Sequence, residues 1–408
     1  MKTILMTAYD IDPYRGSESA TGWNFVLQGA RFNKVIAVTR ENNQASIDSY
    51  IEKFRIDTTN IKFYYYDLPY YLRFWKKGAR GSAIYFYLWQ MWLPLFVKIR
   101  KIKFDIAHNV NFHADAFPTF LWVLGKPTVW GPINHNEKIP KEYLLSKKEF
   151  IKDRIKWIVK TVNWKLDPFL YLAKKRCAII IGGNSSVQKR LSIPKEKFVQ
   201  LTQVASSIQN DRNTNKDDKC FDVIIVGRFL TIKSFDIAIL AFEDFYNNLS
   251  EQERKGVKLS IIGDGPIDLK EICLKLNSKN QIDFHGWVDK REMDSFYQKS
   301  NVFVFPSHEG AGMVVVEALA NALPIVCFDN YGPGELVNER CSIKIPYSNR
   351  TESIINFSTA MKRLHGDKKM CLKKSIGSID LFKDRYTWDS KGTILKEIYG
   401  NLKIYIKK

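Results

Sequence analysis

The chain has few cysteines and no long apolar run. Its six cysteines among 408 residues are widely spaced and form no CxxC pair, so neither a disulfide framework nor a zinc site is indicated. This usage fits a reducing compartment. The longest apolar stretch, residues 84–97, contains Pro94 and is shorter than the roughly 20 residues that span a bilayer. We therefore expect no membrane-spanning helix.

The first residues, MKTILMTAYDID, lack the long apolar core and the small-residue cleavage site of a secretory leader. We expect them to form a β-strand. Repeats and low-complexity segments are missing too. With 45% hydrophobic and 26% charged residues, the composition is that of a globular protein, and the length predicts two to three domains.

Acidic residues are scarce relative to basic ones. The chain has 63 Lys and Arg against 43 Asp and Glu, a net charge of +20. So basic a protein suits a nucleic acid, an anionic membrane surface or an anionic small substrate. Lysines scattered over a solvated surface explain the same excess, so charge alone selects no partner.

Short apolar segments alternate with helical ones, which predicts an α/β fold with mostly parallel sheets. Residues 209–219 are polar, lack apolar periodicity and have the composition of a linker. We predict an N-terminal domain over residues 1–205, a second domain over residues 206–385, and a C-terminal helix over residues 386–408 that packs back on the first domain. Open α/β sheets bind ligands outside the carboxyl ends of their strands, so the site is expected between the domains. The predicted strands are residues 3–9, 35–39, 62–66, 105–109, 128–131, 178–182, 199–204, 221–226, 258–262, 281–285, 302–306 and 324–328, and the predicted helices include residues 20–32, 84–101, 234–246, 269–276, 290–299 and 314–321.

One strand-to-helix turn in the second half combines glycines with carboxylates. Residues 301–324 read NVFVFPSHEGAGMVVVEALANALP, with Glu309, Gly310 and Gly312 between a predicted strand and a helix that begins near Met313. Free N–H groups at a helix start, the helix dipole and glycines that allow close approach form an anion site. A diphosphate is the natural guest.

Two carboxylates and two cations extend this pattern. Glu309 and Glu317 are eight residues apart, roughly 10–12 Å if the segment is mostly helical, which is about the distance from the sugar to the ribose of a nucleotide sugar. Glu317 is also explained as a carboxylate that complements the helix dipole. Arg228 ends the first strand of this half and Lys233 opens the next helix. Both side chains can converge on phosphate. The same sequence is also compatible with two surface cations that face solvent.

The segments GRFLTIK, IIGDGP, FHGWV and FPSHEGAGMVVVEALANALPIV resemble, in order and spacing, the motifs of the retaining family-4 glycosyltransferases of the GT-B fold. The resemblance covers about residues 221–337. It implies two Rossmann-like domains that face each other across a cleft, and transfer of a sugar from a nucleotide-sugar donor. Ser234 and Ala322 replace glycines that are usual in the family.

The resemblance also assigns roles by position. It implies that Arg228 and Lys233 bind the donor diphosphate, that Glu309 faces the donor sugar as a catalytic residue, and that Glu317 binds the ribose. Backbone groups of the glycine loop hold the distal phosphate, and a later loop meets the nucleobase edge. The residues implied for these contacts are Gly310, Gly312, Met313, Val314, Gly286 and Trp287.

The first half resembles one branch of the same family, which is associated with bacterial surface-polysaccharide assembly. The motifs are a GSE loop, a GWN helix, a D-x-x-H strand and a WGP turn, here residues 16–18, 22–24, 105–108 and 130–132. Gly16 is expected to bind the donor, because a glycine can let a ligand approach the backbone closely. The residues expected on the acceptor side are Ser17, Glu18, Asn111 and His135, with Asn136 beside the last.

His108 is the candidate catalytic residue of the first half. It ends a predicted strand on the carboxyl side, where it can bond a donor-sugar hydroxyl or polarise the reacting groups. A buried histidine with satisfied ring nitrogens is an equally good explanation. His113, farther along the same loop, is a less favoured substitute.

The sequence offers no convincing metal motif. Asp10-Ile11-Asp12 spells D-x-D but lies at the end of the first strand, and there is no carboxylate pair of the glycosidase type. Cations and a helix N-terminus can stabilise a departing diphosphate without a metal. We expect no metal and no cofactor. The resemblance adds an oxocarbenium-like, same-face displacement that retains configuration, with the leaving phosphate helping to deprotonate the acceptor.

Residues 70–103 interleave basic and aromatic side chains, and residues 147–176 are a second basic stretch. Both suit anionic lipids, although a core helix with a basic outer face has the same pattern. We predict a cytoplasmic enzyme, peripheral on the inner face of the cytoplasmic membrane, that uses a UDP- or GDP-sugar and a glycan or lipid-linked acceptor in surface-polysaccharide synthesis, without nucleic acid. The alternatives are a nucleotide-sugar epimerase on the same scaffold and a basic nucleic-acid-binding protein.

Overall fold

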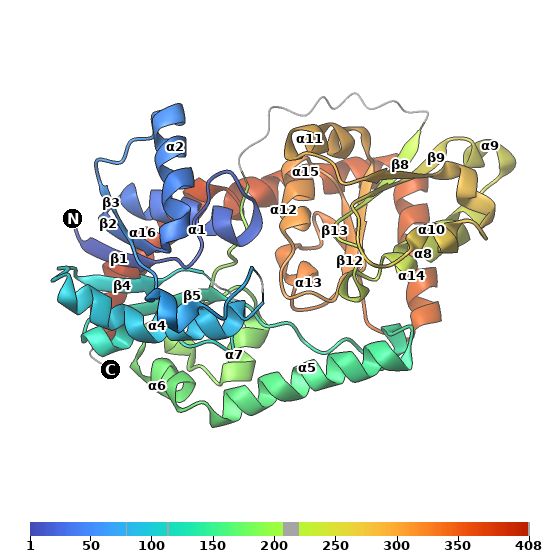
Figure 1. Cartoon of the computed structure of the whole chain (residues 1–408). Helices are drawn as coiled ribbons and strands as arrows, with labels where there is room; N and C mark the ends of the chain where they lie inside the picture. Colours follow the sequence, from blue (N-terminus) through green and yellow to red (C-terminus); the bar gives the residue numbers. More distant parts are fainter. Residues whose placement is uncertain (79, 112–113, 207–219, 407–408) are drawn as a thin grey trace. The chain divides into compact units, whose positions relative to one another are not determined.

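The computed structural model describes residues 1–78, 80–111, 114–206 and 220–406. Contacts divide the chain into two compact units (Figure 1). The first comprises Met1–His135, Ile158–Val204 and Trp388–Lys408, and the second comprises Asn136–Trp157 and Ala205–Thr387. The expected linker, residues 209–219, lies outside the described residues.

The described part of the first unit contains a seven-stranded sheet in the order β3-β2-β1-β4-β5-β6-β7. Every neighbouring pair is parallel. The order reverses between β1 and β4, as in Rossmann-like sheets, and such a reversal is where ligands bind. The strands are β1 Thr3–Thr7, β2 Lys34–Thr39, β3 Ile61–Tyr65, β4 Ile106–Asn109, β5 Thr128–Ile133, β6 Ile179–Gly182 and β7 Phe198–Gln200.

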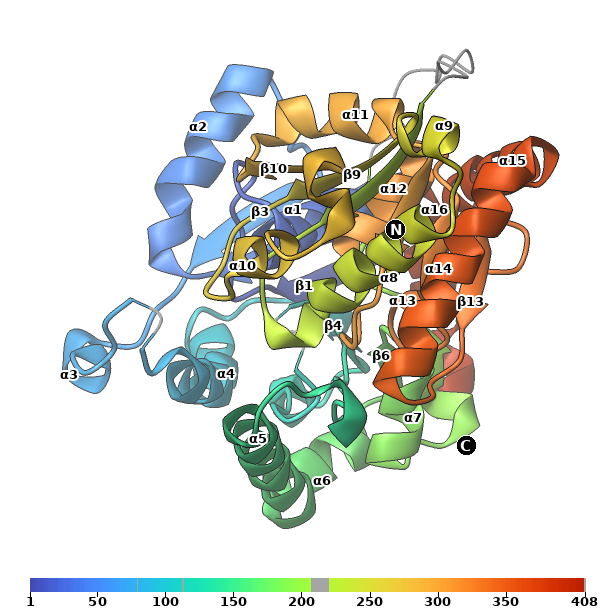
Figure 2. The ribbon, with the colours of Figure 1, turned by 90° about the vertical axis from the view of Figure 1, so that its right-hand side faces the viewer.

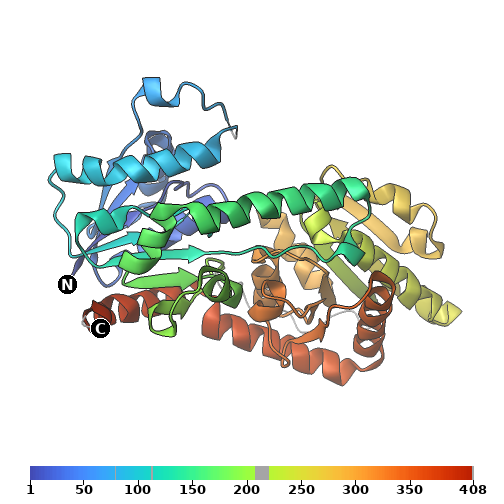
Figure 3. The ribbon, with the colours of Figure 1, turned by 90° about the horizontal axis from the view of Figure 1, so that it is seen from below.

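Helices cover both faces of this sheet. Helix α5 begins in the second unit and ends in the first. The hydroxyl of Tyr87 on α4 donates to the carboxylate of Asp167, the N-cap of α6, which shows that these two helices lie near each other (Figure 3). The helices are α1 Ser17–Ala30, α2 Gln44–Phe54, α3 Tyr70–Arg73, α4 Ser82–Ile99, α5 Lys147–Leu166, α6 Pro168–Arg176, α7 Ser185–Leu191 and α16 Trp388–Ile406.

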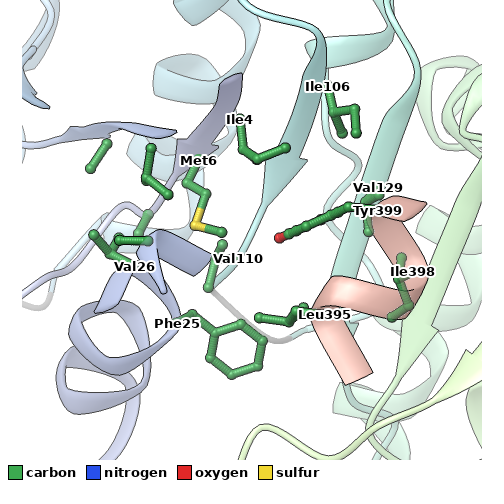
Figure 4. Close-up of a cluster of buried hydrophobic side chains, with 14 of the residues drawn as sticks. Ile4, Met6, Phe25, Val26, Ile106, Val110, Val129, Leu395, Ile398 and Tyr399 are labelled. Atoms are coloured by element: carbon green, nitrogen blue, oxygen red, sulfur yellow. The ribbon is translucent and has the colours of Figure 1, made fainter. Parts of the chain in front are cut away.

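Alternation along β1 divides the core of the first unit in two, because successive strand residues point to opposite faces. On one face, Ile4 and Met6 pack with residues of α1 and with Tyr399 of α16 (Figure 4). On the other face, Leu5 packs with Trp89 of α4. The C-terminal helix α16 is thus part of the core of the first unit.

The second unit contains a six-stranded sheet in the order β10-β9-β8-β11-β12-β13, again with parallel neighbours. The interior strands β8, β11 and β12 are almost continuously apolar and buried, as expected where helices cover both faces. The order reverses between β8 and β11. The strands are β8 Phe221–Val226, β9 Val257–Ile262, β10 Ile282–Gly286, β11 Val302–Phe305, β12 Ile325–Phe328 and β13 Ser342–Ile345.

Helices α8 and α14 pack against each other beside this sheet (Figure 2), and α12 packs against α15. Among the described residues of both units, no helix is long and apolar enough to cross a bilayer. The helices are α8 Phe235–Asn247, α9 Glu251–Arg254, α10 Leu269–Cys273, α11 Lys290–Lys299, α12 Met313–Ala320, α13 Pro333–Leu336, α14 Arg350–Gly366 and α15 Lys368–Arg385.

Residues 136–157 were predicted in the first domain, whereas they belong to the second unit. Tyr143 shows why. Its hydroxyl lies 2.8 Å from Ser353 Oγ and 3.0 Å from the Ser348 carbonyl oxygen, and its ring packs edge-on against Phe328. These partners are far away in sequence, so no local pattern marks the crossing of the chain.

Candidate active site

Two loops meet where the second sheet reverses its strand order. One follows β8 and carries Arg228 and Lys233, and the other follows β11 and carries Glu309 and Gly312. A backbone hydrogen bond of 2.8 Å from the N–H of His308 to the Ile232 carbonyl joins them. The fold therefore collects, at one edge of one sheet, residues that the sequence analysis predicted on separate motifs.

Lys233 and Glu309 form an ion pair. Lys233 Nζ lies 2.7 Å from Glu309 Oε2, and the two side chains are only 13% and 20% exposed. The ammonium also lies 4.7 Å from the centre of the Phe305 ring. Burial raises the pKa of Glu309, although the nearby Lys233 opposes this by lowering it. The pair therefore joins the two loops through a largely buried contact between opposite charges.

Arg228 is exposed, on a loop whose backbone is held by a second turn. The Phe229 N–H donates to the Asp264 carbonyl at 2.7 Å. A Cβ on Gly263 would lie 2.0 Å from the Gly227 carbonyl oxygen, and one on Gly265 would lie 2.6 Å from the Phe229 oxygen. The glycines of IIGDGP are therefore needed to seat the arginine loop, which leaves the guanidinium facing solvent.

The glycine loop leads into helix α12, whose first residues are Met313 and Val314. Gly312 is the N-cap, and no side chain caps this helix start. Its first N–H groups are the kind that bind phosphate. Gly310 differs from the prediction, because its N–H donates to Asn136 Oδ1 at 2.7 Å. In this conformation that group is already satisfied and does not await a ligand.

Glu317 lies one turn into α12, where Tyr297 orients it. The Tyr297 hydroxyl donates to Glu317 Oε2 at 3.2 Å, and burial raises the pKa of this tyrosine. The predicted spacing of Glu309 and Glu317 assumed a mostly helical segment, but the helix begins only at Met313. That estimate of distance therefore does not apply to the segment as folded.

Gly286 is the last residue of β10 and Trp287 follows it, two strands away from β8 in the sheet. Gly286 adopts a φ of +64°, and its carbonyl accepts the Gly263 N–H at 2.7 Å. Trp287 is 73% exposed, so its indole face is open to a planar ligand. The loop is thus tied to the same turn that seats the Arg228 loop.

The two departures from the family pattern have the same backbone feature. Ser234 has a φ of +47° and Ala322 a φ of +52°, in the left-handed region that favours glycine. Ser234 offsets part of this cost with hydrogen bonds of its hydroxyl to Thr231 and His308. The hydroxyl gives Ser234 a local role that a glycine would not have.

In the first unit, the loop after β1 is held internally. Asp10 accepts from Ser19 Oγ at 2.6 Å and from Arg40 at 3.2 Å. Asn111 Nδ2 donates to the Asp10 carbonyl at 2.5 Å and more weakly, at 3.4 Å, to that of Glu18. Asn111 is almost fully buried, so it braces the loop, and its predicted place on the acceptor side is not supported.

Other predicted residues of this loop differ in exposure. Gly16 is the N-cap of α1, and apart from its chain neighbours nothing lies within 4 Å of the position that a Cβ would take there, so a ligand can approach from that side. Glu18 lies in the first turn of the same helix. Ser17 is the first residue of α1, but its side chain lies outside the described part, as does His113.

His108 is a core residue in this structure. It is 0% exposed, with Nδ1 2.6 Å from the Tyr399 hydroxyl and Nε2 2.7 Å from the Gly131 carbonyl. Burial lowers its pKa to about 4, so the ring is neutral. Both nitrogens have internal partners, and the geometry supports the buried, satisfied histidine and not the catalytic one.

His135 is also buried, with Nδ1 2.9 Å from Asp115 Oδ2 and its ring against Trp164. Its carbonyl accepts from Asn184. These contacts make it a structural anchor of the turn after β5, and acceptor contact is not supported for it. The next residue, Asn136, reaches the glycine loop of the second unit.

Tyr297 was not predicted as the partner of Glu317, and Asn136 was expected on the acceptor side. Tyr297 sits on α11, in an ordinary amphipathic pattern, and Asn136 follows a β-strand by three residues. Only the fold brings them to the site. Together the arrangement offers cations, N–H donors and two carboxylates, which suits a diphosphate flanked by hydroxyl groups.

Comparison with known proteins shows which family and which relatives the chain resembles. Residues 206–353 match the family model described as "Glycosyl transferases group 1". The chain is 24% identical to Protein CapJ of Staphylococcus aureus over 189 residues, 46% of this chain and 47% of that protein. It is 28% identical to the amylovoran biosynthesis glycosyltransferase AmsD of Erwinia amylovora over 184 residues, 43% and 49% of the two chains. The chain thus spans about half the length of the relatives it matches.

The fold resembles that of solved structures. The Anabaena protein HepE, in a crystal structure with UDP, superposes with a TM-score of 0.64 at 13% identity, covering 98% of this chain and 100% of that chain. A likeness at this identity shows a shared fold.

Proposed function

We infer that this chain, whose residues 206–353 belong to the group 1 glycosyl transferases and which has the GT-B fold, transfers a sugar from a nucleoside-diphosphate sugar to an acceptor. The observation that carries the proposal is the Lys233–Glu309 ion pair beside the uncapped start of α12. A leaving diphosphate needs cations and N–H donors, and sugar hydroxyls suit a carboxylate. The CapJ and AmsD matches, and UDP in the HepE structure, point the same way.

In the proposed reaction, the donor diphosphate competes with Glu309 for Lys233. The ammonium moves to phosphate oxygens, joined by Arg228 and by N–H groups at the start of α12. Glu309, released from the pair, accepts hydrogen bonds from hydroxyl groups of the donor sugar, and Glu317 accepts hydrogen bonds from those of the ribose. Trp287 flanks the nucleobase. The nucleoside is uridine or guanosine.

The chemical step breaks the bond between the anomeric carbon and the phosphate oxygen. The acceptor oxygen bonds to the same face of the sugar, and its proton passes to the leaving phosphate oxygen. The products are a nucleoside diphosphate and a glycoside of retained configuration. Lys233 and Arg228 carry the charge that develops on the phosphate.

We propose that the reaction needs no metal. The carboxylates of the D-x-D-like segment already have partners, Asp10 with Arg40 and Ser19, and Asp12 with Arg15 at 3.1 Å and the Tyr14 N–H at 3.0 Å. Transfer should therefore continue at an undiminished rate in excess EDTA. A loss of activity that Mg²⁺ restores would contradict this part of the proposal.

The proposed acceptor is a growing glycan or a lipid-linked glycan of a surface polysaccharide, met at the inner face of the cytoplasmic membrane. On α4, large apolar side chains recur on an exposed stripe, Ile84, Trp92, Leu95 and Ile99, and the helix end carries Lys98. Exposed apolar residues also lie along residues 158–166, the part of α5 that belongs to the first unit, beside lysines of the same helix. An apolar stripe among cations suits an anionic bilayer surface.

Vesicle flotation tests the membrane part. The protein should float with anionic liposomes and much less with neutral ones, and replacing Trp92 and Leu95 by Ser should reduce flotation. Failure to float with either kind of liposome would exclude this mode of attachment without affecting the proposed reaction.

The reaction itself is tested by incubating the protein with UDP- and GDP-sugars, with and without candidate acceptors, and analysing sugar and nucleotide products. We expect nucleoside diphosphate release that depends on acceptor and is lost in Glu309→Gln. Epimerised sugar that forms without acceptor would favour an epimerase. Lys383→Gln, a change of an exposed residue on α15, is the surface control.

A further inference from the structure

A chain of hydrogen-bonded polar side chains runs along the carboxyl edge of the second sheet, and its two members nearest to Lys233 and Glu309 in sequence, Ser234 and His308, are buried. Its members are Ser234 after β8, His308 after β11, Asn330 after β12 and Tyr347 after β13. These four strands are neighbours in the sheet, in that order. The chain therefore crosses four successive loops, and two of them carry the proposed donor residues.

Each link is a hydrogen bond of ordinary length. Asn330 Nδ2 lies 3.1 Å from the Tyr347 hydroxyl oxygen, which lies 2.8 Å from His308 Nδ1. His308 Nε2 lies 3.1 Å from Ser234 Oγ. The Ser234 hydroxyl donates in turn to the Thr231 carbonyl at 3.2 Å. His308 bonds Tyr347 on one side and Ser234 on the other, and it belongs to the Glu309 loop.

The amide of Asn330 fixes the direction at one end. Its Oδ1 accepts the N–H groups of Gly332 and Gly334, both at 3.2 Å, and its Nδ2 donates to the Ser307 carbonyl at 2.8 Å. Asn330 must therefore donate to the Tyr347 oxygen, which leaves the tyrosine proton for His308. At the other end the Thr231 carbonyl can only accept, so Ser234 uses its proton there.

One protonation state of the imidazole satisfies every link. His308 accepts the Tyr347 proton at Nδ1 and donates its own proton from Nε2 to Ser234. The neutral ring fits its surroundings, because burial lowers the pKa of His308 to about 3, and the ring packs against Phe328 and Tyr347 at centroid distances of 5.2 and 5.5 Å.

From this geometry we propose that His308 is a positioning residue, which holds the Lys233 turn and the Glu309 loop in register through its Nε2–H bond to Ser234. Ser234 follows Lys233 directly, and Glu309 follows His308 directly. The bond therefore fixes the separation of the ammonium and the carboxylate. It also explains a serine at a left-handed position, since glycine would leave the Nε2–H without its acceptor.

Only the expected effect on nucleotide binding rests on the proposed function. The hydrogen-bond chain itself is tested by long-range ¹H–¹⁵N NMR of the histidine-labelled protein at neutral pH, with the His308 signals assigned by their loss in His308→Gln. We expect the Nε2–H tautomer. An Nδ1–H tautomer or a charged ring would overturn the proposal.

The consequence is tested by calorimetric titration with UDP and GDP, using His308→Phe, which keeps the ring stacking, and His308→Gln, which keeps a donor and an acceptor. We expect His308→Phe to weaken binding about tenfold, equivalent to about 1.4 kcal/mol, and His308→Gln to restore most of it. Tyr386→Phe is the control, because it too removes a buried hydrogen-bonding group, the hydroxyl that donates to the Leu336 carbonyl, and this group does not contact the chain of polar side chains.

Two results would refute the positioning role. One is wild-type affinity in His308→Phe, and the other is equal loss in the Phe and Gln variants while both stay folded by circular dichroism. If the wild-type protein binds neither nucleotide, the proposed function fails, whereas the NMR result still decides between the His308 tautomers.

Discussion

Replacing Lys233 by Met should destabilise the protein in a pH-dependent way, because it leaves Glu309 buried without its cation. Breaking a buried ion pair by removing one partner costs about 3–5 kcal/mol. The two side chains keep 13% and 20% exposure, so solvent reduces this to about 2 kcal/mol. For a second unit of about 200 residues, that lowers Tm by roughly 4–8 °C.

The pH dependence follows from Glu309. Burial already raises its folded pKa, and Lys233 opposes the rise, so the Met variant should raise it further. A carboxyl with a raised folded pKa costs nothing below its unfolded pKa, near 4.5. The free-energy cost of folding grows as pH rises above that value. The carboxyl ionises freely in the unfolded chain, whereas in the folded protein it must either keep its proton or carry a buried charge. The penalty should be small at pH 5 and full at pH 8.

The assay is differential scanning calorimetry of four proteins, the wild type, Lys233→Met, Glu309→Gln and the double variant, at both pH values. The double variant should recover most of the loss, because no charge is left unpaired. An equal Tm shift at pH 5 and pH 8, or a double variant as unstable as Lys233→Met, would refute this explanation of the pair.

Three further changes test other parts of the structure. Ala322→Gly should raise Tm by roughly 1–2 °C in a thermal melt, because it relieves a left-handed φ at a gain of about 0.5 kcal/mol; a fall in Tm would contradict the strain. Gly332→Ala should weaken nucleotide binding in calorimetric titration, because its Cβ would lie 1.7 Å from the Glu309 carbonyl oxygen; unchanged affinity would show that the loop adapts. Tyr399→Phe should cost about 1 kcal/mol of stability with nucleotide affinity unchanged, since His108 is placed in the core; a large loss of affinity would return His108 to the site.

Much of the second unit was predictable because its signals are local. The buried strands β8, β11 and β12 read as apolar runs bounded by glycine or proline, and the residues after them fall at the sheet edge by topology alone. Lys233 and Glu309 were therefore predicted at one site. Their direct ion pair was not, since it depends on how two loops distant in sequence pack against each other.

Contacts between segments that are distant in sequence could not be predicted. β13 was missed because its four residues alternate too briefly to stand out, and with it Tyr347 was lost. Asn136 lies 174 residues from Gly310, whose N–H it accepts. For His108 the sequence supported a ligand role and a core role equally, and only its partners Tyr399 and Gly131 decide for the core.

The central claim is that the second unit holds a diphosphate through Lys233 and the start of α12. Calorimetric titration of the wild-type protein and of Lys233→Met with UDP, UMP, GDP and GMP tests it most directly. One diphosphate should bind about tenfold or more tightly than its monophosphate, and Lys233→Met should erase that difference. Equal affinity for diphosphate and monophosphate in the wild type, or a preference that survives in Lys233→Met, would contradict it.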